Sequence, residues 1–145
     1  YSLNKNYFWK GDNFGNENKF VTELPDSSNN FLVISKDKEN YINNYIVSSS
    51  NNLYLLDSDF NISSTYFELE YFIDELSLVR TKDESFIVCK GENQFDIFND
   101  KLERQTTISL EYSDFLTVFD IDNNNKLNYF TNSNNFIFNN EILLD

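Results

Sequence analysis

Short runs of three or four apolar residues, separated by polar turns, recur along the whole chain. The runs are rich in Phe, Tyr, Ile and Val, and turns that contain Asn interrupt them at intervals typical of short antiparallel strands. Only residues 69–78 have a spacing that also suits a helix. The pattern therefore predicts an all-β fold.

Four predicted hairpins share one layout, in which an apolar strand, a polar turn and a second strand beginning with a large apolar residue follow one another. The first strands are residues 7–9, 45–47, 86–88 and 129–130. The second strands begin at Phe14, Leu53, Phe95 and Phe136, which are 39, 42 and 41 residues apart. Gly and Asn in the turns tolerate positive φ, which favours tight hairpins.

Two further apolar runs precede three of these hairpins, at residues 20–24 and 31–34, 66–69 and 76–79, and 107–110 and 116–119. The unit is thus four short strands in about 41 residues, a period typical of a propeller blade. This predicts one repeat domain over residues 1–145, with a half unit at 1–19 and units at about 20–63, 64–104 and 105–145. We expect a β-propeller-like fold, partial or small, with a β-sandwich as the alternative.

An acidic loop joins two predicted strands near the C-terminal end of the chain, and it contains Asp120, Asp122, Asn124 and Asn128. The loop resembles those of VCBS or FG-GAP repeats, which build propellers in integrin-type and secreted bacterial proteins. Their loop has the form D-x-D-x-D-G-x-x-D and often binds calcium, so the resemblance implies these four residues as calcium ligands. Asn replaces the third and last acids here, and Asn125 occupies the usual glycine position. Two carboxylates make a weak calcium site, and an ordinary Asn-rich connection is the alternative.

The composition excludes several kinds of chemistry. The 145 residues include no histidine, so they cannot form a Ser-His-Asp or Cys-His nucleophile or an imidazole zinc site. Alanine, the strongest helix former, is also absent, in agreement with strands. Cys89 is the one cysteine, which excludes an intramolecular disulfide, and its apolar neighbours predict a buried thiol.

The charge of the chain indicates what kind of partner to expect. Eleven Lys and Arg against 24 Asp and Glu give a formal net charge of −13, which repels phosphate backbones and attracts basic proteins. We therefore expect a protein partner and no direct contact with nucleic acid. No run of about 18 apolar residues occurs, so no membrane insertion is expected. Solubility in a host with an AT-rich genome would explain the charge without any partner.

The sequence favours a non-enzymatic, acidic protein-binding domain without a required cofactor. In composition it is similar to bacterial immunity proteins, so the most concrete hypothesis is an inhibitor of a basic toxin. Carboxylates would cover the basic surface of the toxin while an aromatic side chain provides a desolvated anchor. The candidate residues for partner binding are Glu68, Glu70, Asp74, Glu75, Trp9 and Tyr66.

Two alternatives belong to other classes. One is an extracellular propeller repeat module that binds calcium or, through an aromatic platform at Trp9, carbohydrate. The other is a carboxylate-based glycosidase, for which Glu68 and Glu70 would lie two apart on one face of a strand. An immunity protein would be cytoplasmic and a surface module extracellular, so the sequence leaves the compartment open.

Overall fold

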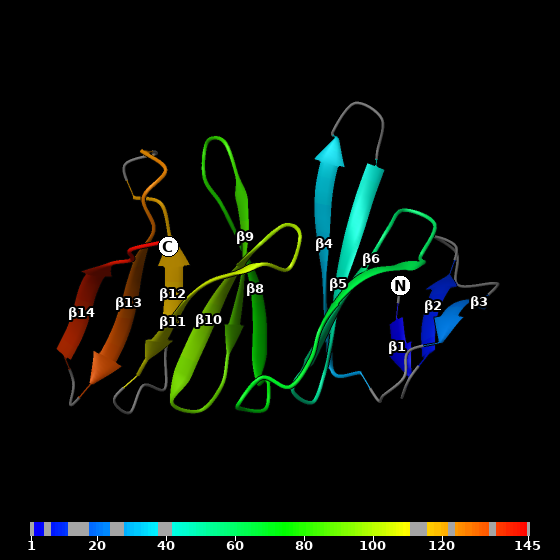
Figure 1. Cartoon of the computed structure of the whole chain (residues 1–145), viewed down its shortest axis with the longest axis horizontal. Helices are drawn as coiled ribbons and strands as arrows, with labels where there is room; N and C mark the ends of the chain where they lie inside the picture. The colour runs from blue at the N-terminus through cyan, green and yellow to red at the C-terminus, as the bar shows by residue number, and fades with distance from the viewer. Residues whose placement is uncertain are drawn as a thin grey trace. The chain divides into compact units, whose positions relative to one another are not determined.

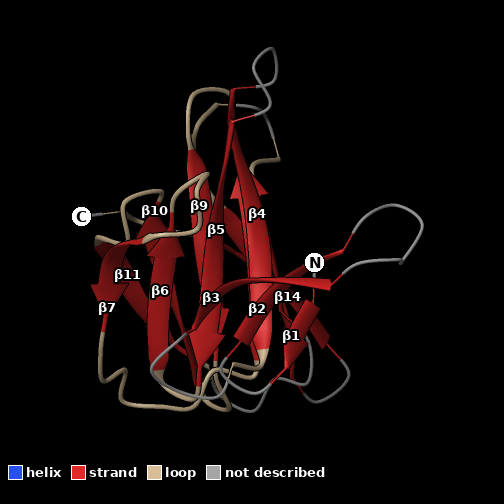
Figure 2. Ribbon diagram, turned by 90° about the vertical axis from the view of Figure 1, so that its right-hand side faces the viewer, coloured by secondary structure: helices blue, strands red, loops and turns tan. Residues whose placement is uncertain are grey.

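A computed structural model of the chain describes residues 2–4, 7–11, 18–23, 28–37, 42–110, 116–121, 124–133 and 136–144. These ranges contain fourteen β-strands and no helix (Figures 1 and 2). The all-β prediction is confirmed, and the alternative helix at residues 69–78 is replaced by a loop and a strand. A search of the described residues finds no helix long and apolar enough to cross a membrane.

The chain forms two compact units, Tyr1–Ile73 and Asp74–Asp145. The first unit contains a three-stranded antiparallel sheet in the order β1-β2-β3 and a four-stranded one in the order β4-β5-β6-β7. Their strands are β1 (Ser2–Asn4), β2 (Tyr7–Gly11), β3 (Asn18–Glu23), β4 (Asn30–Asp37), β5 (Ile42–Ser49), β6 (Asn52–Leu56) and β7 (Ile62–Tyr66).

The second unit contains a four-stranded antiparallel sheet in the order β11-β10-β9-β8 and a three-stranded one in the order β12-β13-β14. Each sheet is therefore built from strands that are consecutive in the chain. The strands are β8 (Glu75–Arg80), β9 (Ser85–Lys90), β10 (Gln94–Asn99), β11 (Arg104–Ser109), β12 (Leu116–Phe119), β13 (Asn128–Ser133) and β14 (Phe136–Glu141).

The repeat has a regular period, but its sheets begin one strand later than the predicted units. Strands β6, β10 and β14 begin at residues 52, 94 and 136, so each lies 42 residues after the one before. The apolar runs that the sequence placed first in each unit correspond to β3, β7 and β11, which pair instead with the strands preceding them. Loop length explains the difference in two of these cases, because only residues 57–61 precede β7 and 100–103 precede β11, whereas longer connections follow both.

The second strand of the first predicted hairpin begins at Phe14, which lies outside the described residues. Strand β2 pairs with β1 on one side and with β3, beginning at Asn18, on the other. The predicted strand at residues 66–69 was wrong beyond its first residue, because β7 ends at Tyr66.

The loop between β6 and β7 is closed by one carboxylate. The Oδ1 atom of Asp57 accepts hydrogen bonds from the backbone N–H groups of Asp59 and Asn61, both at 2.9 Å. The N–H of Asn61 is the main cause that lowers the pKa of Asp57 below its ordinary value. Phe60 has a left-handed backbone, with φ of 67°, and this turns the chain while its ring stacks on Tyr45 in the core.

The loop between β10 and β11 repeats this geometry 42 residues later. The Oδ1 atom of Asn99 accepts hydrogen bonds from the N–H groups of Lys101 and Glu103, both at 3.0 Å. Leu102 takes the place of Phe60, with φ of 64° and a buried side chain. In both loops the first and fifth side chains also bond to each other. The two four-stranded sheets therefore share their turn chemistry as well as their strand order.

The core of the second unit lies between its two sheets. Four consecutive residues are buried in each of the central strands β9 and β10, so both faces of these strands are covered. The ring of Phe95 in β10 meets that of Tyr129 in β13 edge-on, with 5.3 Å between centroids. The buried cluster consists of Val79, Phe86, Val88, Phe95, Ile97, Leu110, Val118, Leu127 and Ile142.

Candidate functional site: the 67–73 loop

Three residues of the predicted partner-binding set lie at or just beyond the end of β7. Tyr66 is the last residue of the strand, pairs with Leu53 and is half-buried. Glu68 and Glu70 follow in a loop and are exposed. The prediction that they share one face of a strand was wrong, since the chain leaves the sheet after Tyr66 and Glu68 has a left-handed backbone with φ of 62°. We call residues 67–73 the 67–73 loop.

Hydrogen bonds hold the 67–73 loop against the turn between β5 and β6 (Figure 1). The N–H of Leu69 donates to the carbonyl of Asn51 at 2.9 Å, and the Asn51 side-chain amide donates back to the Leu69 carbonyl at 3.1 Å. The N–H of Ile73 donates to the Ser50 carbonyl at 2.8 Å. The side-chain oxygen of Asn52 accepts from the N–H of Glu68 at 3.0 Å, which holds the unfavourable backbone of that residue in place. The loop is therefore fixed near its start and at its end.

The side chains of the loop divide into buried and exposed ones. Leu69 and Ile73 are buried, so they anchor the loop in the core of the first unit. Phe67 is 54% exposed, with one edge against the buried ring of Tyr54 at 5.9 Å, and Phe72 is 73% exposed. Large aromatic side chains held in water on a fixed backbone lose little entropy on binding, as partner recognition requires.

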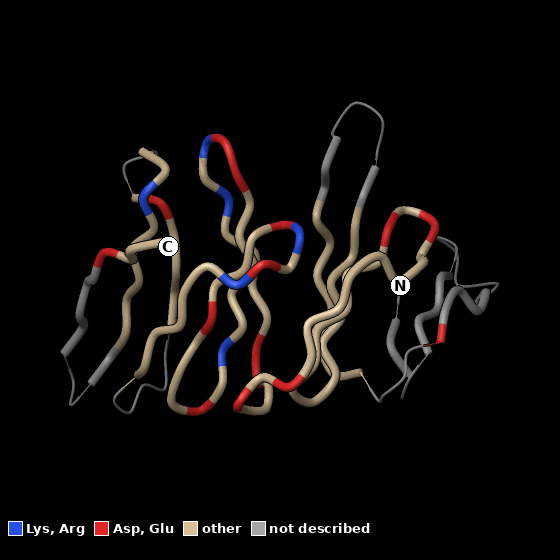
Figure 3. Tube along the Cα trace, viewed as in Figure 1, with Lys and Arg blue, Asp and Glu red and all other residues tan. Residues whose placement is uncertain are grey.

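The 67–73 loop also carries negative charge. Between Lys38 and Arg80 the sequence contains no Lys or Arg, and Figure 3 shows acidic but no basic positions over residues 42–73. Neither Glu68 nor Glu70 forms an ion pair with another residue that the structure describes. The loop thus combines exposed aromatic rings with exposed carboxylates, in a stretch of the sequence that contains no basic residue.

The other predicted partner-binding residues belong to other elements of the fold. Asp74 and Glu75 are exposed and begin the second unit, where the N–H of Asp74 donates to the carbonyl of Lys90 at 2.9 Å. Trp9 lies in β2, where its backbone pairs with Ser2 and Phe20, but its side chain falls outside what the structure describes.

Of the four candidate calcium ligands, Asp120 is used to close its own loop. Its two carboxylate oxygens accept hydrogen bonds from the N–H groups of Asn124, at 3.1 Å, and Asn125, at 2.9 Å. Asn128 has become the first residue of β13, and Asp122 lies outside the described residues. A cation would have to compete with these backbone donors for both oxygens of Asp120.

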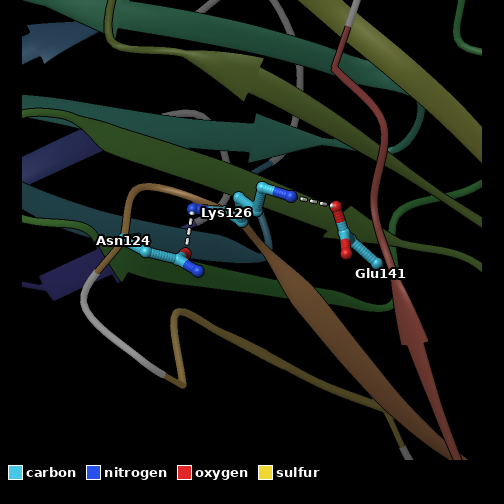
Figure 4. A network of polar contacts seen from close by, with 3 residues as sticks. All are labelled: Asn124, Lys126 and Glu141. Carbon is cyan, nitrogen blue, oxygen red and sulfur yellow. Dashed lines mark hydrogen bonds and ion pairs between the residues drawn. The ribbon is translucent and has the colours of Figure 1, made fainter.

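Three further polar residues that the structure describes in this loop are also engaged, two of which are drawn in Figure 4. The side-chain oxygen of Asn124 accepts from the N–H of Lys126 at 2.9 Å, and the Lys126 ammonium forms an ion pair with Glu141 at 3.0 Å. Asn125 donates to Asp83 on the loop between β8 and β9. No group of three or more Cys, Asp or Glu side chains within the described ranges is placed to hold a metal ion, so calcium binding here stays a prediction.

Replacing Asp120 with alanine is expected to lower the free energy of unfolding by about 1–2 kcal/mol, because two backbone donors lose a charged acceptor. Urea titrations in chelator and in millimolar calcium would measure the loss, which we expect to be the same in both. Glu141→Gln, which removes only an exposed ion pair, is the matched control and should cost less than about 1 kcal/mol. A calcium-dependent stabilisation that Asp120→Ala removes would instead identify a cation site.

A buried carboxylate and thiol face each other in the second unit. Asp96 in β10 is fully buried, pairs with Cys89 in β9, and accepts a hydrogen bond from Thr107 in β11, while an Arg104 nitrogen lies 3.9 Å away. Burial, reinforced by the charge of Asp96, raises the pKa of the Cys89 thiol well above its ordinary value. The prediction of a buried thiol is confirmed, and such a thiol is protonated and unreactive.

The exposed rings Phe67 and Phe72 were not among the residues chosen from the sequence, although a sequence signal for the loop exists. The tripeptide Leu69-Glu70-Tyr71 recurs 41 residues later as Leu110-Glu111-Tyr112. Leu110 is also buried, and its N–H donates to the Asn93 carbonyl at 2.7 Å, just as that of Leu69 does to Asn51. Residues 111–115 lie outside the described ranges.

Comparisons with known proteins give a likeness of fold only. No protein family and no curated protein matches the chain. The crystal structure of BBS1N in complex with ARL6DN, soaked with mercury, is similar with a TM-score of 0.63 and 12% identity, over 96% of this chain and 45% of the matched chain. The same complex soaked with lead gives a TM-score of 0.59 and 14% identity, over 88% and 45%. The chain thus spans less than half the length of the solved chains it matches.

Proposed function

We propose that the chain is a non-enzymatic protein-binding domain that recognises a basic partner protein through the 67–73 loop. The observation that carries the proposal is the exposure of Phe67 and Phe72 on a backbone that four contacts with residues 50–52 hold in place. Aromatic side chains are enriched among the residues that dominate protein interfaces. The exposed carboxylates of Glu68 and Glu70 in the same loop favour a partner of positive charge.

The sheets are proposed to be blades of a β-propeller. Four-stranded antiparallel sheets of consecutive strands, repeating every 42 residues, are typical of that architecture. The likeness in fold to the BBS1N structures supports the proposal. Those structures are complexes with ARL6DN, which makes binding of a partner protein a reasonable expectation for this chain as well. The most specific form of the proposal is inhibition of a basic toxin, which rests on composition alone.

Replacing Phe72 with serine is expected to reduce partner capture at least about tenfold, the effect of losing a central aromatic anchor. The immobilised chain would capture proteins from an extract of the cells that express it, with quantification of the protein retained at one-to-one stoichiometry. Leu143→Ser is the matched control, because Leu143 is 79% exposed and lies in the other unit.

The captured partner, once purified, provides a second test of the same proposal. Added salt should slow its association, because attraction between opposite charges accelerates the encounter. Equal capture by wild type and Phe72→Ser, or association that does not depend on salt, would contradict recognition of a basic partner through this loop.

A further inference from the structure

The 67–73 loop offers two kinds of groups at once, and this narrows the chemistry of its partner. Exposed aromatic rings alone would fit any apolar surface, and exposed carboxylates alone would fit any cation. Phe72 is the most exposed of the phenylalanine side chains that the structure describes, and Glu70 is exposed two residues before it. A ligand that uses both must carry positive charge and also present a face that packs on a ring.

We infer that the 67–73 loop binds an arginine side chain of the partner protein, with the guanidinium packed on Phe72 and paired with Glu70. This inference rests on the proposed function. The guanidinium is planar, always charged and weakly hydrated, so it can stack on an aromatic ring while its N–H groups donate hydrogen bonds to a carboxylate. The lysine ammonium is a compact and strongly hydrated charge, which gains less from a ring in water.

The charge distribution supports a positive ligand over a second copy of this chain. The 67–73 loop contains Glu68 and Glu70 and no basic residue, so two copies of this surface repel each other. No ion pair between described side chains involves Glu70, and the residue is exposed, so its carboxylate is accessible to an incoming arginine.

The fixed backbone explains why the site would not collapse when it is empty. Leu69 and Ile73 flank the exposed segment, and both are buried and hydrogen-bonded to the turn at residues 50–51. Glu70, Tyr71 and Phe72 therefore span a short bridge between two anchors. A preformed site loses less entropy on binding, which makes even a single arginine contact measurable.

The test is a titration of the full chain, labelled with ¹⁵N, with three blocked tripeptides: acetyl-Gly-Arg-Gly-amide and its lysine and citrulline counterparts. Citrulline keeps the planar shape of arginine without the charge. We expect saturable shifts in the amides of the 67–73 loop, with arginine bound about two- to fivefold more tightly than lysine, the range of an exposed cation–π contact. The shifts caused by the citrulline peptide should not saturate.

Two variants and one control separate the contribution of the Phe72 ring from that of the Glu70 carboxylate. Phe72→Leu keeps an apolar side chain without a π face, so it should lower the affinity for the arginine peptide to that for the lysine peptide. Glu70→Gln should weaken both cationic peptides, whereas Glu92→Gln, at an exposed position in the turn between β9 and β10, should weaken neither. Equal affinities for arginine and lysine, or shifts spread over the acidic residues of both units, would overturn the inference.

Failure of this inference and failure of the proposed function give different results. If no peptide binds the loop but Phe72→Ser still abolishes capture of the partner, the loop is an interface that uses another chemistry and the arginine assignment is wrong. If Phe72→Ser changes neither peptide binding to the loop nor capture of the partner, both proposals are wrong. Sedimentation at increasing concentration gives one further outcome: self-association that Phe72→Leu removes would identify a second copy as the occupant and overturn the inference.

Discussion

Replacing Phe95 with alanine is expected to lower the free energy of unfolding by about 3–5 kcal/mol, the usual cost of removing a buried phenylalanine ring. Phe95 is completely buried in β10, and its ring packs edge-on against Tyr129 of the neighbouring sheet in the same unit. The variant therefore leaves a cavity between two sheets as well as losing apolar contact. Urea denaturation followed by circular dichroism would measure the change.

The matched control is another phenylalanine in a different environment. Phe72→Ala should change the free energy of unfolding by no more than about 0.5 kcal/mol, because the ring is 73% exposed. A small loss for Phe95→Ala would contradict the packing of β10 against β13. A large loss for Phe72→Ala would mean that this ring stabilises the fold and is not available to a partner.

Replacing Leu69 with alanine is expected to cost about 2–5 kcal/mol and to release the 67–73 loop from the turn between β5 and β6. The side chain is buried, and its backbone N–H and C=O both bond to Asn51. Loss of the side chain removes the apolar contact that keeps these two groups aligned. Amide hydrogen exchange would show the release as faster exchange at positions 69 and 73.

Leu143→Ala is the control for this experiment, because Leu143 is 79% exposed and should change neither stability nor exchange in the loop. Unchanged protection at positions 69 and 73 in Leu69→Ala would show that the hydrogen bonds alone hold the loop. The same variant should weaken partner binding without altering an exposed residue, since the rings would lose their fixed backbone.

The strands and the period of the repeat could be predicted from the sequence because apolar runs and Asn-rich turns are local signals. Leu53, Phe95 and Phe136 each lie at or one residue from the start of a strand. Pairing is less local. Strand β7 has neighbours on both sides in the sequence, and it pairs with β6 across the short loop that Asp57 closes.

The candidate site was predicted in its charge but not in its geometry. Glu68 and Glu70 belong to the exposed loop, yet alternation along residues 66–69 suggested a strand where the chain turns away from the sheet. That turn depends on Asn51 and Asn52, which are 16 or more residues away in the chain. Phe67 and Phe72 look like core residues by composition, because an exposed phenylalanine has no signature of its own in the sequence.

The two equivalent loops that begin at Asp57 and Asn99 have the same backbone geometry but carry their carboxylates at different positions. One loop has its carboxylate first and its amide fifth, and the other has the amide first and the carboxylate fifth, as Glu103, with the same hydrogen-bond pattern. The turn requires an acceptor at its first position but does not require that acceptor to be charged. Acidic side chains can therefore move from one end of such a loop to the other, and redirect the electrostatic field toward a new partner, while every strand keeps its register.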